Sequence, residues 1–348
     1  MSNYLMKMII SQVAEKPVEP DIDVTSIPLT FTAEEAGTVV SIWRDGEPNV
    51  DGLQYRLGTS GGWTKYVIEE GITLENVGDT VQFQNTLDTL SVDWDYVFFY
   101  IKGKAAASGN IMSLINYATE CYEACFRNLF LGCEGLTAAP ELPATILARE
   151  CYSYMFSQCP NLATAPDLPA TVLDEECYFS MFENSGITVP PKILPAMTLR
   201  PHCYKNMFKG CEELTTSPEL PATVMADGCY DQFLASTSIT EAPALPATEL
   251  ADECYLQMFV WCTALIKAPE LPATDLKHGC YEQMFTGCRN LKEIKVHFTS
   301  WGEEGERFTY NWVRTVGSTG IFYAPPELQD LRGNNYIPNG WTKTAFLP

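Results

Sequence analysis

The stretch CYSYMFSQCPNLATAPDLPAT, residues 151–171, decides the fold, because close copies of both its halves recur along the chain. The first half follows the phrase Cys-aromatic-x-x-Met-Phe-x-x-Cys with small variations, and the second half contains Leu-Pro-Ala. Leu-Pro-Ala starts at residues 142, 168, 194, 220, 245 and 271, and the leading cysteine stands at residues 125, 151, 177, 203, 229, 254 and 280. A fixed period of 25 or 26 residues is typical of a protein built from stacked repeats.

The two halves of a unit predict different local structures. In the first half the apolar residues fall at i, i+1, i+4, i+5 and i+8, from Cys151 to Cys159. This spacing fits one face of a short amphipathic helix, and acidic residues such as Asp174 and Glu175 would suit the positive end of its dipole. The second half contains two prolines, so we expect a short strand or a polyproline-like run.

Stacking such units predicts an α/β solenoid of seven units of about 26 residues. A unit with one helix and one extended limb cannot bury its own apolar face, whereas a stack buries a continuous core. Packed helices lie ~9 Å apart and paired strands ~4.8 Å apart. We therefore expect the helical side of the stack to be the longer, convex side.

Twelve of the thirteen cysteines occupy two columns of this repeat, and Cys121 is left over. A helix would separate two cysteines eight residues apart by about 12 Å, which is too far for a disulfide. Metal binding would need CxxC pairs or a Cys/His cluster, whereas the one close pair, Cys121 and Cys125, has no partnering histidine. We expect buried thiols that pack as small hydrophobic groups. They are Cys125, Cys133, Cys151, Cys159, Cys177, Cys203, Cys211, Cys229, Cys254, Cys262, Cys280 and Cys288. Units three and five carry Ser185 and Thr237 at the second position and have a shortened turn, which also favours a packing role.

The phrase CYxxMFxxCxxLxxAPELPAT, with Ser108–Leu114 before it, resembles the cysteine-containing leucine-rich repeats of the BspA-like class. Such arrays are frequent in surface proteins of gut bacteria and in gene products of their phages. The resemblance covers about residues 108–296. It implies a leucine-rich-repeat solenoid with a non-catalytic role in recognition or adhesion.

The flanks of the repeat predict three further segments. Residues 1–26 end in a stretch rich in proline and acid and are interpreted as an N-terminal peptide and linker. Residues 27–107 alternate apolar and polar residues between glycine and aspartate breakers, which predicts a small all-β sandwich. The solenoid is expected over residues 108–298, and the aromatic residues 299–348 are expected to form its C-terminal cap.

Aromatic side chains in both flanks are the candidates for ligand binding. In the β-domain they could form a stacking platform for sugars or simply strand core, and in the cap they could form a contact surface or only cover the last unit. The candidates are Trp43, Trp63, Tyr66, Trp94, Trp312 and Tyr336.

The charge of the chain excludes several classes of partner. With 44 acidic and 22 basic residues the net charge is −22, and no basic run is present, so nucleic acid and anionic membrane surfaces are not expected partners. No stretch has the length of a membrane span or the pattern of a signal peptide, so we expect neither. We expect cytoplasmic synthesis, with association to a virion, or exposure at a cell surface if a leader has been removed. No catalytic set, metal site or cofactor motif emerges.

These features favour a recognition or adhesion protein that presents its solenoid to a host glycan or protein, and a phage-encoded adhesin is one such protein. One alternative is a structural virion component, a fibre or decoration protein that contacts neighbouring virion proteins and has no ligand of its own. A second alternative is a carboxylate-based enzyme acting on glycans, because 44 acidic residues make close pairs inevitable.

Overall fold

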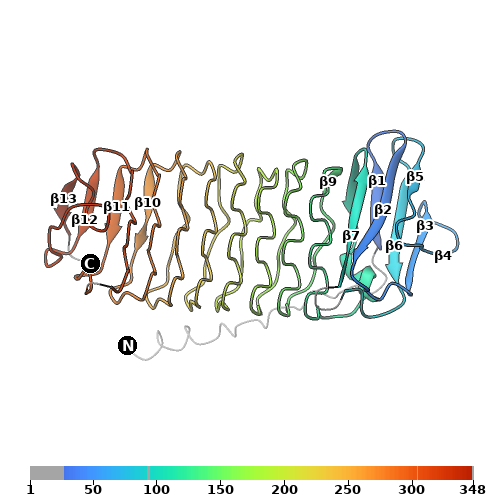
Figure 1. The fold of residues 1–348 in the computed structure, drawn as a ribbon, viewed down its shortest axis with the longest axis horizontal. Helices are drawn as coiled ribbons and strands as arrows, with labels where there is room; N and C mark the ends of the chain where they lie inside the picture. The colour runs from blue at the N-terminus through green and yellow to red at the C-terminus, as the bar shows by residue number, and fades with distance from the viewer. Residues whose placement is uncertain (1–26, 92–94, 304, 347–348) are drawn as a thin grey trace, which may run out of the picture.

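The computed structural model describes residues 27–91, 95–303 and 305–346. Over these residues the chain is mostly sheet, and η1, a 3₁₀ helix over Ile111–Ile115, is the one helix. Figure 1 shows sheets at both ends of an elongated molecule and a row of coils between them. The strands are β1 (Leu29–Ala33), β2 (Thr38–Asp45), β3 (Leu53–Leu57), β4 (Thr64–Lys65), β5 (Ile72–Leu74), β6 (Thr80–Asn85), β7 (Tyr96–Lys102), β8 (Ala105–Ser108), β9 (Leu136–Ala138), β10 (Lys267–Leu271), β11 (Glu293–Val296), β12 (Ile321–Ala324) and β13 (Thr342–Ala345).

The N-terminal domain is built from strands, as the sequence predicts. Strands β5-β2-β7 form one sheet, and β4-β3-β6-β1-β8 form most of the other. Phe31 and Phe83 of the larger sheet pack against Phe99 of the smaller one. The centroid of the Phe99 ring lies 4.9 Å from that of Phe31 and 5.3 Å from that of Phe83. These rings are fully buried, so the core of the domain lies between its two sheets. The N-terminal peptide and linker, residues 1–26, lie outside the described residues.

The larger sheet continues into the first repeat unit without a break. Strand β9 belongs to that unit and pairs in parallel with β8. The ring of Phe99 also stacks on that of Phe130 in the first unit, with a centroid distance of 5.3 Å and an interplanar angle of 17°. The domain therefore covers the first coil and shields its apolar side from water.

The first half of each unit is a series of tight turns, and the predicted amphipathic helix is wrong. Backbone amides donate alternately within the unit and to the next one. Met155 donates to the carbonyl of Tyr152 at 3.2 Å, whereas Phe156 donates to the carbonyl of Met181 at 2.8 Å. Every fourth residue has a positive φ, such as Tyr154 at 57° and Gln158 at 58°. A right-handed helix cannot contain such left-handed residues, so Asp174 and Glu175 do not cap a helix.

Because the turns are hydrogen bonded between units, both sides of the stack have the same short spacing. Backbones paired in this way lie about 4.8 Å apart, rather than the ~9 Å of packed helices. The prediction of a longer, convex helical side is therefore wrong. Figure 1 shows the coils side by side in a nearly straight row.

Identical side chains stack into columns in the core. Phe156 lies between Phe130 and Phe182, with ring centroids 5.2 and 5.6 Å away and planes within 4°. A second column runs through the buried tyrosines, for example Tyr178 and Tyr204, whose rings lie 5.5 Å apart. Each unit alone would leave these rings in water, so stacking supplies the hydrophobic stabilisation.

The proline-containing halves form the opposite side of the stack. Their prolines cannot donate to a ladder, and the interior units are joined there by isolated parallel bridges such as Ile146 to Val172 and Thr198 to Val224. Regular strands occur only in the end units among the described residues. The expectation of a short strand or a polyproline-like run, and not a long strand, agrees with these isolated bridges.

The stacking continues past residue 298, where the sequence places the cap. Phe285 donates to the carbonyl of Trp312 at 2.8 Å, and positive φ values recur at Arg307, Asn311 and Thr315. The segment around residues 307–315 is therefore an eighth set of turns without the repeat phrases. Strands β10-β11-β12-β13 form a parallel sheet beside it. Among the described residues, no helix has the length and the apolar character needed to cross a membrane.

Candidate ligand-binding pocket at the C-terminal end

The aromatic residues predicted to form a platform in the β-domain lie in different parts of that domain. Trp43 lies on β2 with 40% of its surface exposed and meets Tyr100 edge-on. Trp63 lies near β4, in the other sheet, with the guanidinium of Arg56 4.6 Å from its ring. Tyr66 is buried, and its hydroxyl accepts from the amide of Ile42 and donates to the carbonyl of Glu70. These three rings share no face, and Trp94 lies outside the described residues.

The two candidates in the cap lie close together but differ in accessibility. Trp312 is fully buried, and its indole N–H donates to the carbonyl of Tyr336 at 2.9 Å. Its ring is therefore closed to a ligand in this structure. The ring of Tyr336 is half-buried and lines a pocket on the surface.

This pocket has a volume of about 870 Å³ and lies at the C-terminal end of the stack. Four aromatic residues line it among hydroxyl, amide and charged groups. Concave sites that combine aromatic walls with a few polar groups are typical of ligand binding. The lining residues are Thr299, Ser300, Trp301, Gly302, Glu303, Gly305, Arg307, Phe308, Thr309, Tyr310, Glu327, Gln329, Leu331, Asn335 and Tyr336.

Trp301 is the side chain that the surrounding structure fixes best. Its indole N–H donates to the carbonyl of Gln329 at 2.9 Å, and Tyr336 meets its ring edge-on at 5.4 Å. Behind it lie the buried rings of Phe298 and Trp312, with centroids 5.3 and 6.1 Å away. This wall of the pocket is therefore preorganised by the core of the last coil.

Charged side chains also line the pocket. Arg307 is the one basic residue among those lining it, and its guanidinium bonds to both carboxylate oxygens of Glu282, with Nε 2.8 Å from Oε2. That carboxylate raises the pKa of Arg307. The guanidinium also lies 4.8 Å from the ring of Tyr310. The charge of the Arg307 guanidinium is therefore balanced by Glu282. Because Glu303 and Glu327 also line the pocket, the net charge of its lining is negative.

The structure places all twelve repeat thiols in the core. Those of the second column bond to the preceding unit: Cys159 donates to the carbonyl of Phe130 at 3.0 Å, and Cys211 donates to that of Phe182 at 3.0 Å. In unit three, which lacks this cysteine, the hydroxyl of Ser185 donates to the same Phe182 carbonyl at 2.7 Å. The cysteine bonds therefore join neighbouring units through a carbonyl that also accepts an amide of its own unit, whereas the Ser185 bond stays within unit three.

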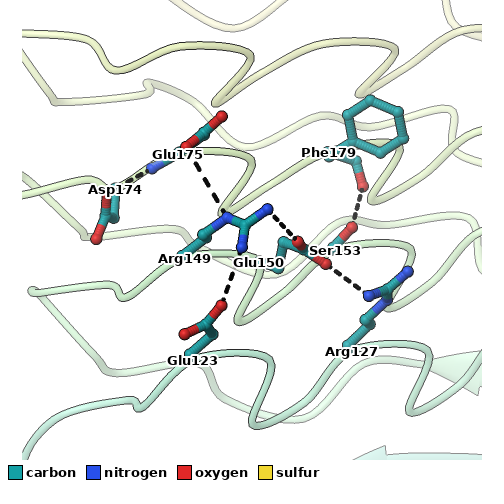
Figure 2. Close-up of polar contacts among 8 residues, drawn as sticks. All are labelled: Glu123, Arg127, Arg149, Glu150, Ser153, Asp174, Glu175 and Phe179. Atoms are coloured by element: carbon teal, nitrogen blue, oxygen red, sulfur yellow. Dashed lines mark hydrogen bonds and ion pairs between the residues drawn. The ribbon is translucent and has the colours of Figure 1, made fainter. Parts of the chain in front are cut away.

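A second cluster of charged residues, drawn in Figure 2, crosses the first three units. Arg149 lies 3.1 Å from Glu123 and 3.1 Å from Glu150, and its Nε lies 3.9 Å from Glu175. Arg127 and Glu150 are 2.6 Å apart, with both side chains mostly buried. Because these carboxylates are already paired with guanidinium groups, the cluster holds adjacent units in register and does not offer a cation site.

In the part of the chain that the structure covers, no three His, Cys, Asp or Glu side chains are grouped as metal ligands would be. Comparison of the chain with protein-family models, with curated proteins and with solved structures gave no match.

Sequence reasoning chose Trp312 and Tyr336 in the cap and missed Trp301 and Tyr310. The missed residues lie among glycines and polar side chains, next to Gly302 and Thr309, as residues of an exposed turn do. Trp312 instead stands in the column of the repeat phenylalanines, which predicts burial. This difference could have been recognised if the repeat had been followed past residue 298.

Proposed function

We propose that this protein is a leucine-rich-repeat solenoid of the BspA-like class and that it recognises a host glycan without catalysis. The proposal rests on the pocket of about 870 Å³ between Trp301 and Tyr310. Figure 1 shows the β-domain and the C-terminal segment, whose residues line the pocket, at opposite ends of the stack. A protein attached through its β-domain would present this pocket at the far end. Such an arrangement fits a bacterial surface protein or a phage-encoded adhesin.

The chemistry of the walls favours a sugar. A sugar ring has C–H groups on its faces and hydroxyl groups at its edge. The aromatic rings of Trp301, Tyr310 and Tyr336 match the faces, while Glu327 and Asn335 can accept or donate at the edge. A protein partner would bring larger apolar side chains, whereas most of the residues that line this pocket are polar, charged or glycine.

The charge of the pocket favours neutral sugars over acidic ones. The Arg307 guanidinium is held by Glu282, and Glu303 and Glu327 remain on the wall. A sialylated oligosaccharide would bring a carboxylate towards like charge in a chain of net charge −22. Neutral oligosaccharides are therefore the expected class of ligand.

Binding of the full chain to immobilised neutral and sialylated oligosaccharides tests the proposal. We expect binding to neutral members of the array and at least a tenfold loss in Tyr310→Ala, about 1.4 kcal/mol. The matched control is Trp43→Ala, because Trp43 and Tyr310 are exposed to a similar extent, 40% and 42%, and Trp43 lies on β2 and does not line the pocket. This variant should bind as the parent protein does.

Two outcomes would contradict the proposal. One is the absence of binding to any oligosaccharide by a folded, monodisperse protein. The other is a loss in Trp43→Ala with none in Tyr310→Ala, which would place the site on the β-domain. The bound oligosaccharide should also be recovered intact after prolonged incubation, as judged by mass spectrometry, since the proposed role is non-catalytic.

A further inference from the structure

Arg307, the one basic residue that lines the C-terminal pocket, is held by a carboxylate that does not line it. The Nε of Arg307 donates to Oε2 of Glu282 at 2.8 Å, and its Nη2 donates to Oε1 of the same side chain. The guanidinium carbon lies 4.8 Å from the centroid of the Tyr310 ring. These two contacts fix the position of the guanidinium in the pocket wall.

Glu282 is itself fixed by the stack. Its side chain is 9% exposed. Its amide donates to the carbonyl of Gly279 at 3.0 Å, and its own carbonyl accepts from the amide of Gln257 in the preceding unit at 2.9 Å. A buried carboxylate needs a partner of opposite charge, so the pair with Arg307 belongs to the fold as well as to the pocket wall.

A similar ion pair joins units four and five outside this pocket. Asp231 stands at the same third position of its repeat phrase as Glu282, is buried, and lies 3.0 Å from Lys205 of the preceding unit. Neither Asp231 nor Lys205 lines the pocket. Comparison of the two pairs therefore distinguishes a role in joining units from a role in binding.

The pair with Glu282 leaves part of the Arg307 side chain free. A guanidinium has five N–H groups in a rigid fork. Two of them are on Nη1, which has no hydrogen-bond partner among the residues that the structure describes. The side chain is 48% exposed, so a ligand can reach these donors. Because Glu282 balances the charge, the pocket offers guanidinium donors without the attraction of an unpaired cation for anions.

We propose that Glu282 is a positioning residue that sets which ligand charge the pocket accepts, an inference that rests on the proposed recognition of glycans. Held by Glu282, Arg307 donates from Nη1 to hydroxyl oxygens of a neutral sugar. Without the Glu282 carboxylate, the Nε and Nη2 edge of the guanidinium is free to bind a carboxylate through two parallel hydrogen bonds. Glu303 and Glu327 line the pocket in both cases, so the difference comes from Glu282.

Glu282→Gln in the full chain tests this role, because glutamine keeps the size of the side chain and removes its charge. On the array of neutral and sialylated oligosaccharides, we expect the ratio of sialylated to neutral binding to rise at least fivefold over that of the parent protein. Adding Arg307→Gln to this variant should abolish the rise. An unchanged ratio in folded Glu282→Gln, or a rise that persists in the double variant, would overturn the proposal.

Asp231→Asn is the matched control, since it removes a buried carboxylate from the same repeat position and breaks an ion pair between two units. It should lower the midpoint of thermal unfolding, as Glu282→Gln does, and leave the binding ratio unchanged. An equal rise of the ratio in Asp231→Asn would show that Glu282 acts only through stability.

Reaction of Arg307 with phenylglyoxal, followed by peptide mapping in a mass spectrometer, gives a test on the unaltered chain. A neutral oligosaccharide that binds should slow this reaction at least threefold, because it covers Nη1. A sialylated oligosaccharide at the same concentration should not slow it. Equal protection by both, or no protection by a bound neutral oligosaccharide, would contradict the proposal even if Glu282→Gln does not fold.

Sulfate distinguishes a failure of this inference from a failure of glycan recognition. In Glu282→Gln the reaction of Arg307 with phenylglyoxal should be at least fivefold faster than in the parent protein. Sulfate, compared with chloride at equal ionic strength, should slow it in the variant and not in the parent. If the parent bound no oligosaccharide, the proposed function would be wrong, and the sulfate result alone would decide the role of Glu282.

Discussion

Phe182 shows how one side chain contributes to this fold. Its ring is fully buried between those of Phe156 and Phe208, with centroid distances of 5.6 and 5.3 Å. Phe182 thus contacts both neighbouring units through the phenylalanine column. Loss of its ring would weaken the interface with each of them. Unit five shows the permitted variation, because Phe233 stands one position earlier and meets Phe208 edge-on at 5.4 Å.

Removing the ring should therefore be costly. We expect Phe182→Ala to lower the free energy of unfolding by about 3–5 kcal/mol. The substitution loses the transfer free energy of the buried ring and leaves a cavity in its place. Chemical denaturation followed by circular dichroism measures this. Val172→Ala is the control, since Val172 is 52% exposed and should change stability by less than about 0.5 kcal/mol. If the two substitutions lowered the free energy of unfolding equally, the phenylalanine column would not be the main source of stability.

The buried thiols predict how stability depends on pH. Burial raises the pKa of Cys211 and of Cys262 to about 11 and that of Cys280 to about 12, while an unfolded cysteine titrates near 8.5. The unfolded chain thus loses its protons first, so the contribution to stability is complete below about pH 8.5 and is lost as the pH rises towards 11 or 12. The midpoint of thermal unfolding under reducing conditions should fall steadily above pH 8.5. A constant midpoint up to pH 10 would show that these thiols are not buried.

The turn half of the unit is the element that the sequence predicted wrongly. Its apolar residues repeat with a strict period of four, from Cys151 through Met155 to Cys159. Over eight residues a helix of 3.6 residues per turn follows this period closely enough to be mistaken for it. The more specific signal is the residue at each left-handed position, which in several units is glycine or asparagine, as at Asn184, Gly210 and Gly287. A helix interior would exclude them, since glycine there costs about 1 kcal/mol.

Substitution by glycine distinguishes the two structures by the sign of its effect. Gln158 has a φ of 58° and is exposed. Because a left-handed residue with a side chain carries a cost that glycine does not, Gln158→Gly should raise the free energy of unfolding by up to about 1 kcal/mol. In a helix it would lower it by a similar amount. The control is Glu213→Gly at an exposed residue outside the left-handed positions, and thermal and urea unfolding should show it to be destabilising.

At the scale of the whole molecule, the two ends of the stack are closed by continuing the same hydrogen bonding. The β-domain covers the first coil by pairing β8 with β9 and stacking Phe99 on Phe130. At the other end the turns of residues 307–315 cover Phe285, and the parallel sheet runs on to β13. An open end would expose both apolar columns and a row of unpaired amides, which favours association between chains.

Ending the chain at Phe298 tests this closure. The shortened chain loses the acceptor of the Phe285 amide and the ring of Trp312. We expect it to form dimers or larger species in size-exclusion chromatography with light scattering, because the exposed last coil can stack on a second copy. A chain ending at Phe346 keeps β13 and should remain in the oligomeric state of the full chain. A monomeric, folded chain ending at Phe298 would show that the last coil needs no cover.

The sequence by itself determined the repeat, its period and the residues of the core columns, because burial follows from apolar periodicity and a stack repeats the same environment. It also indicated which cysteines belong to the columns and that Cys121 does not. The tertiary structure decided whether the first half of each unit is a helix or a series of turns. The carbonyl that accepts from every second amide belongs to the next unit along the chain. It also decided the C-terminal pocket, because Trp301 and Gln329 meet only when successive coils fold back on each other.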